Sequence, residues 1–306
     1  MSKPDTAFLR QFEETLKPWN PYDSAFQVEV LGYGEISTVF KLGGNKDWAY
    51  KRMPLFETID AAEVYLTQYN EYCTYLNDAG LILPESHTEI VDIPGRPIVL
   101  YIIQRAYPKS HFCHNRIHGE NREEIQTMLT EIADHLEKIW SFNKSYHPLV
   151  ALAIDGQLSN WVWHEDETGQ RTMIYIDTST PLYRLKEVEQ LDPELFLKSA
   201  PSFLRWIIRW LFLEEVMNRY YDRREVYKDL AANCFKEQAA DYIQTILGIA
   251  NHHLEISLSI KDIESYYQSD KLIWKLFLSF RKIDRFLQRK ILQSRYEFIL
   301  PEIEHR

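Results

Sequence analysis

The order of strand-like and helix-like segments is the feature that most limits what this chain can fold into. Short apolar runs bounded by turn residues occupy residues 26–99, for example "FQVEVLGYGEISTVFKL" and "TEIVDIPGRPIVLYIIQRA". One long amphipathic helix pattern, at roughly 58–78, interrupts these runs. After about residue 107 apolar positions mostly recur at helical spacing, except for one hairpin pattern at 160–177. This order predicts an α+β protein in which a β-rich region precedes a mainly helical one.

We therefore expect two lobes, an N-lobe at 1–106 and a helical C-lobe at 107–306. A short amphipathic helix at 5–17 should precede the strands, because apolar residues recur there every four positions. The long helix of the N-lobe should bury a stripe made of Ile59, Ala62, Leu66, Tyr69, Cys73 and Leu76. The helices expected in the C-lobe lie at roughly 121–142, 201–220 and 271–293.

Charge and cysteine content exclude several classes of protein. The chain carries 35 Lys and Arg against 45 Asp and Glu, a net charge of −10, so we expect no nucleic-acid partner. The three cysteines are far apart and form neither a disulfide framework nor a CxxC metal site. The N-terminus lacks the apolar segment of a signal peptide. The most apolar stretch, "FLRWIIRWLFL", is too short to cross a bilayer, so we expect a cytoplasmic protein without a transmembrane segment.

A glycine-containing hairpin and a strand lysine are the first candidate site residues. Gly32 and Gly34 lie between two strand patterns in "LGYGEISTVF", where glycine would let backbone N–H groups approach a phosphate. For this stretch taken alone, an ordinary hairpin turn is the favoured explanation. Lys51 in "WAYKRM" could direct its ammonium at phosphates if a carboxylate of the long helix held it. Both Glu71 and Glu63 flank the apolar stripe, so geometry does not choose between them, and a surface lysine is the alternative.

Three oxygen-bearing side chains gather at the open end of the predicted hairpin. Asp155 and Asn160 lie in "DGQLSN" before its first strand, and Asp177 follows its second strand in "IYIDTSTP". Residues that flank an antiparallel hairpin are neighbours in space, so Asn160 and Asp177 should meet, with Asp155 nearby. Carboxylate and amide oxygens suit Mg²⁺. The alternative is that each residue only caps a turn, as Asp and Asn often do.

Taken in order, these segments resemble the protein-kinase-like superfamily, and most closely its aminoglycoside phosphotransferase and choline kinase branch. The resemblance covers residues 31–181 through "LGYGEISTVF", "WAYKRM", "DGQLSN" and "IYIDTSTP". It implies a two-lobed fold that binds ATP and Mg²⁺ between the lobes. It also implies an enzyme that transfers phosphate to a hydroxyl of a small-molecule acceptor, because no long activation segment follows Asp177.

The resemblance also implies a role for each candidate residue. The backbone around Gly32, Gly34 and Ser37 would cover the ATP phosphates, and Lys51, paired with Glu71, would contact the α and β phosphates. A hinge from Gln104 to Ala106 would bind adenine. The residues of the second lobe would comprise Asp155 as the base for the acceptor hydroxyl and Asn160 and Asp177 as ligands of Mg²⁺.

Two departures from the family pattern keep other functions open. Ala153 stands where the family has a histidine before Asp155, and Thr178-Ser179-Thr180 replaces the usual Phe-Gly after the metal-binding aspartate. A catalytically silent binding or regulatory module is therefore one alternative. Another is an enzyme of the same fold that modifies a protein by phosphorylation or AMP transfer.

Two further clusters have simpler explanations. "HFCHNRIHG" contains His111, Cys113, His114 and His118, which could hold a metal but are better explained as an exposed loop or a lid on the substrate side. Residues 271–290 carry seven basic residues and one acidic residue, a net charge of +6. This helix could bind an anionic membrane, but we favour packing against the acidic body of the protein.

Overall fold

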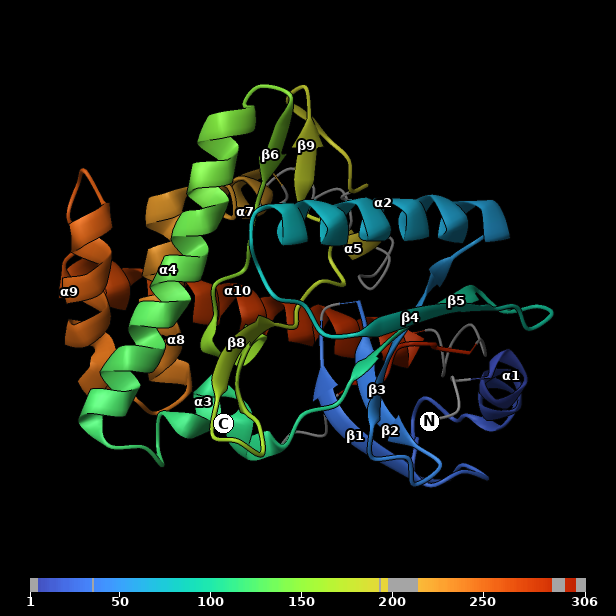
Figure 1. The fold of residues 1–306 in the computed structure, drawn as a ribbon. Coiled ribbons are helices and arrows are strands. Elements are labelled where there is room, and N and C mark those ends of the chain that lie inside the picture. Colours follow the sequence, from blue (N-terminus) through green and yellow to red (C-terminus); the bar gives the residue numbers. More distant parts are fainter. Residues whose placement is uncertain (1–4, 35, 193, 198–213, 288–294, 301–306) are drawn as a thin grey trace.

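The protein has a mixed α and β architecture, with a β-rich N-terminal region and a mainly helical C-terminal region, as the sequence predicts (Figure 1). The computed structural model describes residues 5–34, 36–192, 194–197, 214–287 and 295–300. Most of the helix expected at 201–220 lies outside these residues, and only α7 (Glu214–Arg219) of that segment is described.

Five antiparallel strands form the N-terminal sheet in the order β1-β2-β3-β5-β4. The strands are β1 (Val28–Tyr33), β2 (Thr38–Leu42), β3 (Trp48–Phe56), β4 (Ser86–Val91) and β5 (Ile98–Arg105). Two helices, α1 (Thr6–Thr15) and α2 (Ile59–Asp78), lie on opposite sides of this sheet (Figure 1). The helix α2 begins at Thr58, whose hydroxyl accepts a hydrogen bond from the Ala61 N–H, and ends before Gly80, which has a φ of +90°.

The alternation of side chains along β3 places neighbouring residues in two different environments. Met53 packs in the cluster that includes α2, whereas Tyr50 packs with Phe12 of α1 on the other face. Lys51 and Arg52 follow the same alternation, so Lys51 lies on the α2 side and Arg52 on the α1 side. The candidate lysine therefore faces away from the N-terminal helix.

The C-terminal region contains more β-structure than the sequence predicts. Its strands and short turns are η1 (Lys109–His111), β6 (Val150–Leu152), η2 (Leu158–Asn160), β7 (Trp161–Glu165), β8 (Arg171–Tyr175), β9 (Tyr183–Leu185) and β10 (Val188–Glu189). The β7–β8 pair is the expected hairpin, with Trp161 opposite Tyr175. The expectation that this hairpin is the one exception to a helical pattern after residue 107 is wrong, because β9 and β10 join β6 in a small sheet. Strands of two or three residues leave no periodic signal in a sequence.

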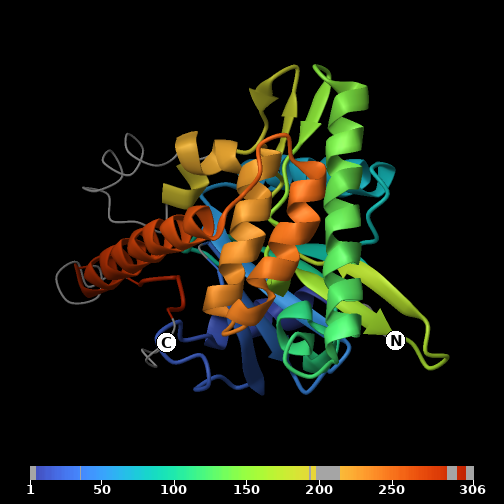
Figure 2. The ribbon, with the colours of Figure 1, turned by 90° about the vertical axis from the view of Figure 1, so that its left-hand side faces the viewer.

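Besides α7, the helices of this region are α3 (Cys113–Arg116), α4 (Arg122–Tyr146), α5 (Glu194–Leu197), α8 (Arg223–Lys236), η4 (Ala240–Tyr242), α9 (Ile243–His253) and α10 (Ile260–Phe286). Among them α8 packs against α9 and α10, and α4 packs against α9 (Figure 2). The last helix starts well before the expected residue 271, because Ser259 and Asp262 form a capping box at its N-terminus. Residues 288–290 of the basic segment lie outside the described part of the chain.

The C-terminal end of the described chain returns to the N-terminal sheet. Arg281 of α10 donates a hydrogen bond of 3.3 Å to the carbonyl oxygen of Gly34. Ile299 packs in the same apolar cluster as α1 and the outer face of the sheet. Glu297 belongs to a buried ion cluster in which Arg52 of β3 also pairs with Glu13 of α1. Segments near both ends of the described chain therefore meet on the face of the sheet that α1 covers.

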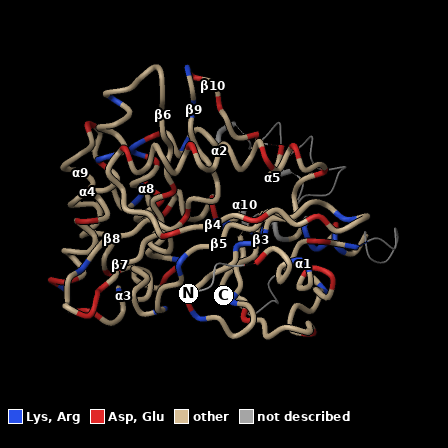
Figure 3. Tube along the Cα trace, turned by 45° about the vertical axis from the view of Figure 1, so that its right-hand side comes forward, with Lys and Arg blue, Asp and Glu red and all other residues tan. Residues whose placement is uncertain are grey.

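Charged residues of both signs are interspersed along most of the described trace (Figure 3). Among the helices the structure describes, none combines the length and the apolar character needed to cross a membrane.

Candidate functional site

Lys51 and Asp177 form an ion pair between residues 126 positions apart in the sequence. The Lys51 Nζ lies 2.8 Å from Asp177 Oδ1, and their side chains are 17% and 26% exposed. Solvent therefore reaches both groups, while the surrounding protein restricts their motion. The pair joins β3 of the N-terminal sheet to the segment that follows the β7–β8 hairpin.

The open end of that hairpin gathers the remaining oxygen-bearing candidates. The N–H of Ile176 donates to the carbonyl oxygen of Asn160 at 2.9 Å, which places Asn160 beside the residue preceding Asp177. Asn160 Nδ2 donates to the carbonyl oxygen of Asp155 at 3.2 Å, and this leaves Oδ1 as the amide atom able to accept or coordinate. Hairpin closure thus brings Asp155, Asn160 and Asp177 together, and the ion pair adds Lys51.

The loop that carries Asp155 lacks the histidine of the family pattern, but other hydrogen bonds hold it in place. The Tyr72 hydroxyl of α2 donates to the Ala153 carbonyl oxygen at 2.8 Å. Asn233 of α8 accepts a hydrogen bond of 3.1 Å from the N–H of Leu158. The Asp155 carboxylate itself accepts a hydrogen bond of 3.1 Å from the N–H of Gln157, which orients the side chain. Residues of α2 and α8, together with a hydrogen bond inside the loop, therefore fix the loop geometry.

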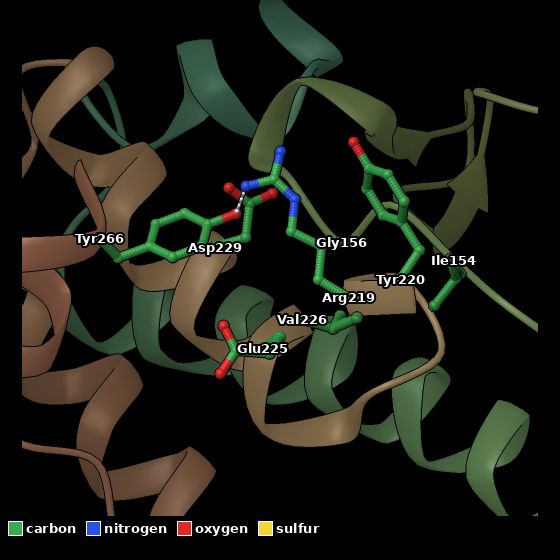
Figure 4. Close-up of a pocket in the computed structure, with 8 residues that line it drawn as sticks. All are labelled: Ile154, Gly156, Arg219, Tyr220, Glu225, Val226, Asp229 and Tyr266. Carbon is green, nitrogen blue, oxygen red and sulfur yellow. Dashed lines mark hydrogen bonds between the residues drawn. The ribbon is translucent and has the colours of Figure 1, made fainter. Parts of the chain in front are cut away.

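A narrow pocket lies beneath this loop and is lined in part by Ile154 and Gly156 (Figure 4). Arg219 extends into it and donates a hydrogen bond of 3.1 Å to the Tyr266 hydroxyl. Burial and the nearby carboxylate of Asp270 raise the pKa of Asp229, another lining residue. The guanidinium of Arg219 fills this space between aromatic and acidic side chains. We therefore interpret these side chains as structural residues that support the loop, not as a binding site for a ligand.

The glycine-containing hairpin has the tight geometry expected of it. The Gly34 N–H donates to the Ser37 carbonyl oxygen at 3.0 Å, and a Cβ at Gly34 would lie only 2.8 Å from Ser37 Oγ. A side chain at Gly34 would therefore require the Ser37 hydroxyl to move, whereas a Cβ at Gly32 would meet no atom within 4 Å.

The hinge residues are more constrained than the sequence indicates. The N–H of Ala106 donates to the carbonyl oxygen of Asp47 at 2.7 Å. Contrary to the expectation, this N–H is therefore not available to bind adenine. The Gln104 side chain donates to the Thr178 hydroxyl at 2.9 Å, which links β5 to the residue after Asp177. Both hydrogen bonds therefore join hinge residues to other groups of the protein.

The expected pairing of Lys51 with a glutamate of α2 is not what the structure shows. Glu71 is exposed and accepts a hydrogen bond of 2.5 Å from the Tyr183 hydroxyl. The other candidate, Glu63, is also exposed. The orientation of α2 about its own axis explains this difference. Its tyrosines face the site, whereas its glutamates face solvent and β9.

Two residues at the site were not identified from the sequence. Ser179 is buried, and its hydroxyl accepts a hydrogen bond from Lys51. Tyr65 of α2 donates to the Ser179 carbonyl oxygen at 2.6 Å. The spacing of Tyr65, Tyr69 and Tyr72 along one helix face is the signal that could have indicated this contact.

The histidine-rich segment does not form a metal centre in the described part of the chain. His111 and His164 approach each other with Nδ1 atoms 3.1 Å apart, and His118 contacts the Glu237 carbonyl oxygen at 2.8 Å. No group of three or more His, Cys, Asp or Glu among the described residues could hold a metal ion.

Comparison with known proteins gives a family without an assigned activity. A family model described as "Family of unknown function (DUF6206)" matches residues 21–285, and the chain belongs to this family. No curated protein matches the chain significantly. One similar solved chain, described as "WaaP in complex with acyl carrier protein", has 12% identity and a TM-score of 0.34. That alignment covers 72% of this chain and 90% of the other, and its TM-score is too low to establish a shared fold.

Proposed function

We propose that this member of the DUF6206 family is an ATP- and Mg²⁺-dependent phosphotransferase that moves the γ-phosphate to a hydroxyl of a small molecule. The observation that carries the proposal is the 2.8 Å ion pair between Lys51 and Asp177. It joins the sheet that bears the glycine hairpin to the hairpin end where Asp155 and Asn160 lie. The protein-kinase-like superfamily uses these residue types in this order, so the sequence resemblance and the geometry favour the same chemistry.

The oxygen atoms at the hairpin end are suited to magnesium. Asp177 would supply a carboxylate oxygen and Asn160 its Oδ1, since Asn160 Nδ2 already donates to the Asp155 carbonyl oxygen. Mg²⁺ commonly takes one or two protein ligands and completes its coordination with water and phosphate oxygens. When bound, the metal would offset the negative charge of the phosphates.

The remaining residues would position the reactants. Lys51 would bind phosphate oxygens through its ammonium, and the backbone near Gly34 would lie over the same phosphates. Asp155 would accept the proton of the acceptor hydroxyl while that oxygen bonds to the γ-phosphorus and ADP leaves. The hydrogen bond from the Gln157 N–H would hold the Asp155 carboxylate in one orientation. Adenine would be bound by groups other than the Ala106 N–H.

A metabolite screen for ATP consumption tests this proposal, with Asp155→Asn as the diagnostic variant. Asparagine keeps the oxygen that accepts from Gln157 but cannot take a proton, so we expect activity to fall by about 10²-fold or more. Asp166→Asn is the matched control, because Asp166 accepts similar hydrogen bonds in the exposed turn at the far end of the same hairpin. Equal activity of Asp155→Asn and wild type would remove Asp155 from this role.

A catalytically silent regulatory module that does not bind nucleotide is the second candidate. The occupied Ala106 N–H favours it, since a nucleotide would need a hinge N–H to bind its adenine. Thermal unfolding with and without Mg-ATP separates the two candidates. Saturating nucleotide at 100 times its dissociation constant should stabilise a true binder by about 2.7 kcal/mol. An unchanged melting temperature would favour the silent module.

A further inference from the structure

The ammonium of Lys51 is held by a serine and an aspartate of one short segment. Lys51 Nζ donates to Ser179 Oγ and to Asp177 Oδ1, and the Ser179 hydroxyl donates to the same Asp177 oxygen at 3.3 Å. The three groups form a closed triangle of hydrogen bonds. A neutral hydroxyl thus occupies the position where the resemblance implies a second carboxylate.

Tyr65 fixes the backbone of this segment from the side of α2. Its hydroxyl donates to the Ser179 carbonyl oxygen at 2.6 Å, and its ring is almost fully buried. Burial, reinforced by the negative charge of Asp177, raises the pKa of Tyr65, so the phenol stays protonated and remains a donor at neutral pH. On the other side, Gln104 donates to Thr178 at 2.9 Å. Both neighbours restrict where the Ser179 hydroxyl can lie.

The rotation of α2 explains why a carboxylate does not take this position. Successive residues of an α-helix are about 100° apart, so Glu63 lies about 200° around the axis from Tyr65. Glu71 is directed to the Tyr183 hydroxyl. Bringing either glutamate to Lys51 would require α2 to rotate and expose the buried rings of Tyr65 and Tyr72.

We propose that Ser179, fixed by Tyr65, is the positioning residue for Lys51 and takes the role of the helix glutamate in this protein. The catalytic meaning of this assignment rests on the function proposed above. Its consequence is electrostatic, because the lysine then has a single carboxylate partner. If Asp177 turned toward a metal, Lys51 would retain only a neutral partner, and its full charge would act on the phosphates.

Acylation of individual lysines in the nucleotide-free protein tests the assignment without any activity. We would treat the protein with acetic anhydride at a fixed pH and measure the rate at each lysine by peptide mass spectrometry, with exposed Lys109 as the internal reference. The lost charge-assisted hydrogen bond in Ser179→Ala should raise the Lys51 rate by roughly tenfold. Tyr65→Phe should raise it less, because the serine hydroxyl remains but its backbone is less restricted.

The matched controls are Glu71→Gln and Glu63→Gln, which should leave the Lys51 rate unchanged. A Lys51 rate that does not change in Ser179→Ala, or that rises as much in either glutamine variant, would overturn the assignment. Circular dichroism verifies folding, and Tyr65→Phe decides if Ser179→Ala does not fold. An effect of Tyr65→Phe no larger than that of the glutamine variants would then reject the assignment.

Binding of Mg-ATP, measured on the same variants, separates this inference from the proposed function. We expect Ser179→Ala to weaken Mg-ATP binding by about tenfold and to leave adenosine binding unchanged. If wild type binds no Mg-ATP but the acylation pattern holds, the phosphotransferase proposal fails and the positioning role of Ser179 stands. If wild type binds and turns over ATP while Lys51 acylation is insensitive to Ser179→Ala, only the positioning role fails.

Discussion

Replacing Glu13 by glutamine should strongly destabilise the N-terminal region, although Glu13 lies far from the candidate site. The Glu13 carboxylate is completely buried and accepts hydrogen bonds from Arg52 and Tyr101, each at 2.6 Å. Arg96 also binds it, and Glu297 completes the cluster by accepting from Arg52 at 2.9 Å. Glutamine would fill the same space but leave the guanidinium groups of Arg52, Arg96 and Arg295 with the carboxylate of Glu297.

The magnitude follows from the pKa of Glu13. Burial alone would raise that pKa, but Arg52 and Arg96 overcome it and lower the pKa from 4.5 to about 2. The difference corresponds to about 3 kcal/mol of stability at neutral pH. Mutational experience with broken buried ion pairs gives a similar range of about 3–5 kcal/mol. Because the folded pKa is depressed, this stability is complete above pH 4.5 and is lost as the pH falls toward 2.

Urea unfolding followed by circular dichroism, repeated between pH 7 and pH 3, measures the effect. Wild type should exceed Glu13→Gln by about 3 kcal/mol at pH 7, and the gap should narrow below pH 4.5. Glu14→Gln is the control, since the adjacent glutamate is exposed and should change stability by less than about 0.5 kcal/mol. A gap of under about 1 kcal/mol at pH 7, or one independent of pH, would refute the electrostatic argument.

Three smaller predictions concern the loop supports and the glycine hairpin. Asn233→Ala removes the acceptor of the buried Leu158 N–H and should lower the unfolding free energy by about 1–3 kcal/mol in urea titration. Asp229→Asn should not lower the melting temperature at pH 7, because burial and a neighbouring carboxylate raise the pKa of Asp229 and already disfavour its charged form. Gly34→Ala should force the Ser37 hydroxyl to move. The free energy of any measured Mg-ATP binding should fall by more than the free energy of unfolding. A loss of stability without a loss of binding would contradict this last prediction.

Local patterns predicted the elements of the fold better than they predicted which helix face is buried. The period of α2 was evident from the sequence, and its expected bounds agree with the structure. Its buried stripe was only partly right, because Tyr65 and Tyr72 are buried while Ile59 is 44% exposed. Hydropathy ranks isoleucine above tyrosine, but tyrosine hydroxyls here find distant partners such as the Ser179 and Ala153 carbonyl oxygens. Such partners belong to the tertiary structure, and the sequence shows only that these tyrosines share one face of the helix.

The candidate site divides in the same way. Asp155, Asn160 and Asp177 could be brought together on paper because hairpin closure is a short-range rule. The partner of Lys51 could not, because it depends on the rotation of α2 relative to the sheet. The strands β9 and β10 were not predicted because they are too short to show a periodic pattern. The burial of Glu13 was not predicted because a charged residue in an amphipathic helix normally faces water.

The strand β3 links the buried ion cluster to the candidate site through two adjacent residues. Lys51 faces the segment of Asp177, and Arg52, on the opposite face, binds Glu13 and Glu297, which are 39 and 245 positions away. A buried cluster of this kind restricts the backbone that carries it, since any shift of Arg52 would leave charges unpaired. The position of the Lys51 ammonium therefore depends on both ends of the chain. A phosphate-binding lysine needs such a fixed position, because misplacement by about 1 Å can cost about 10²-fold in rate.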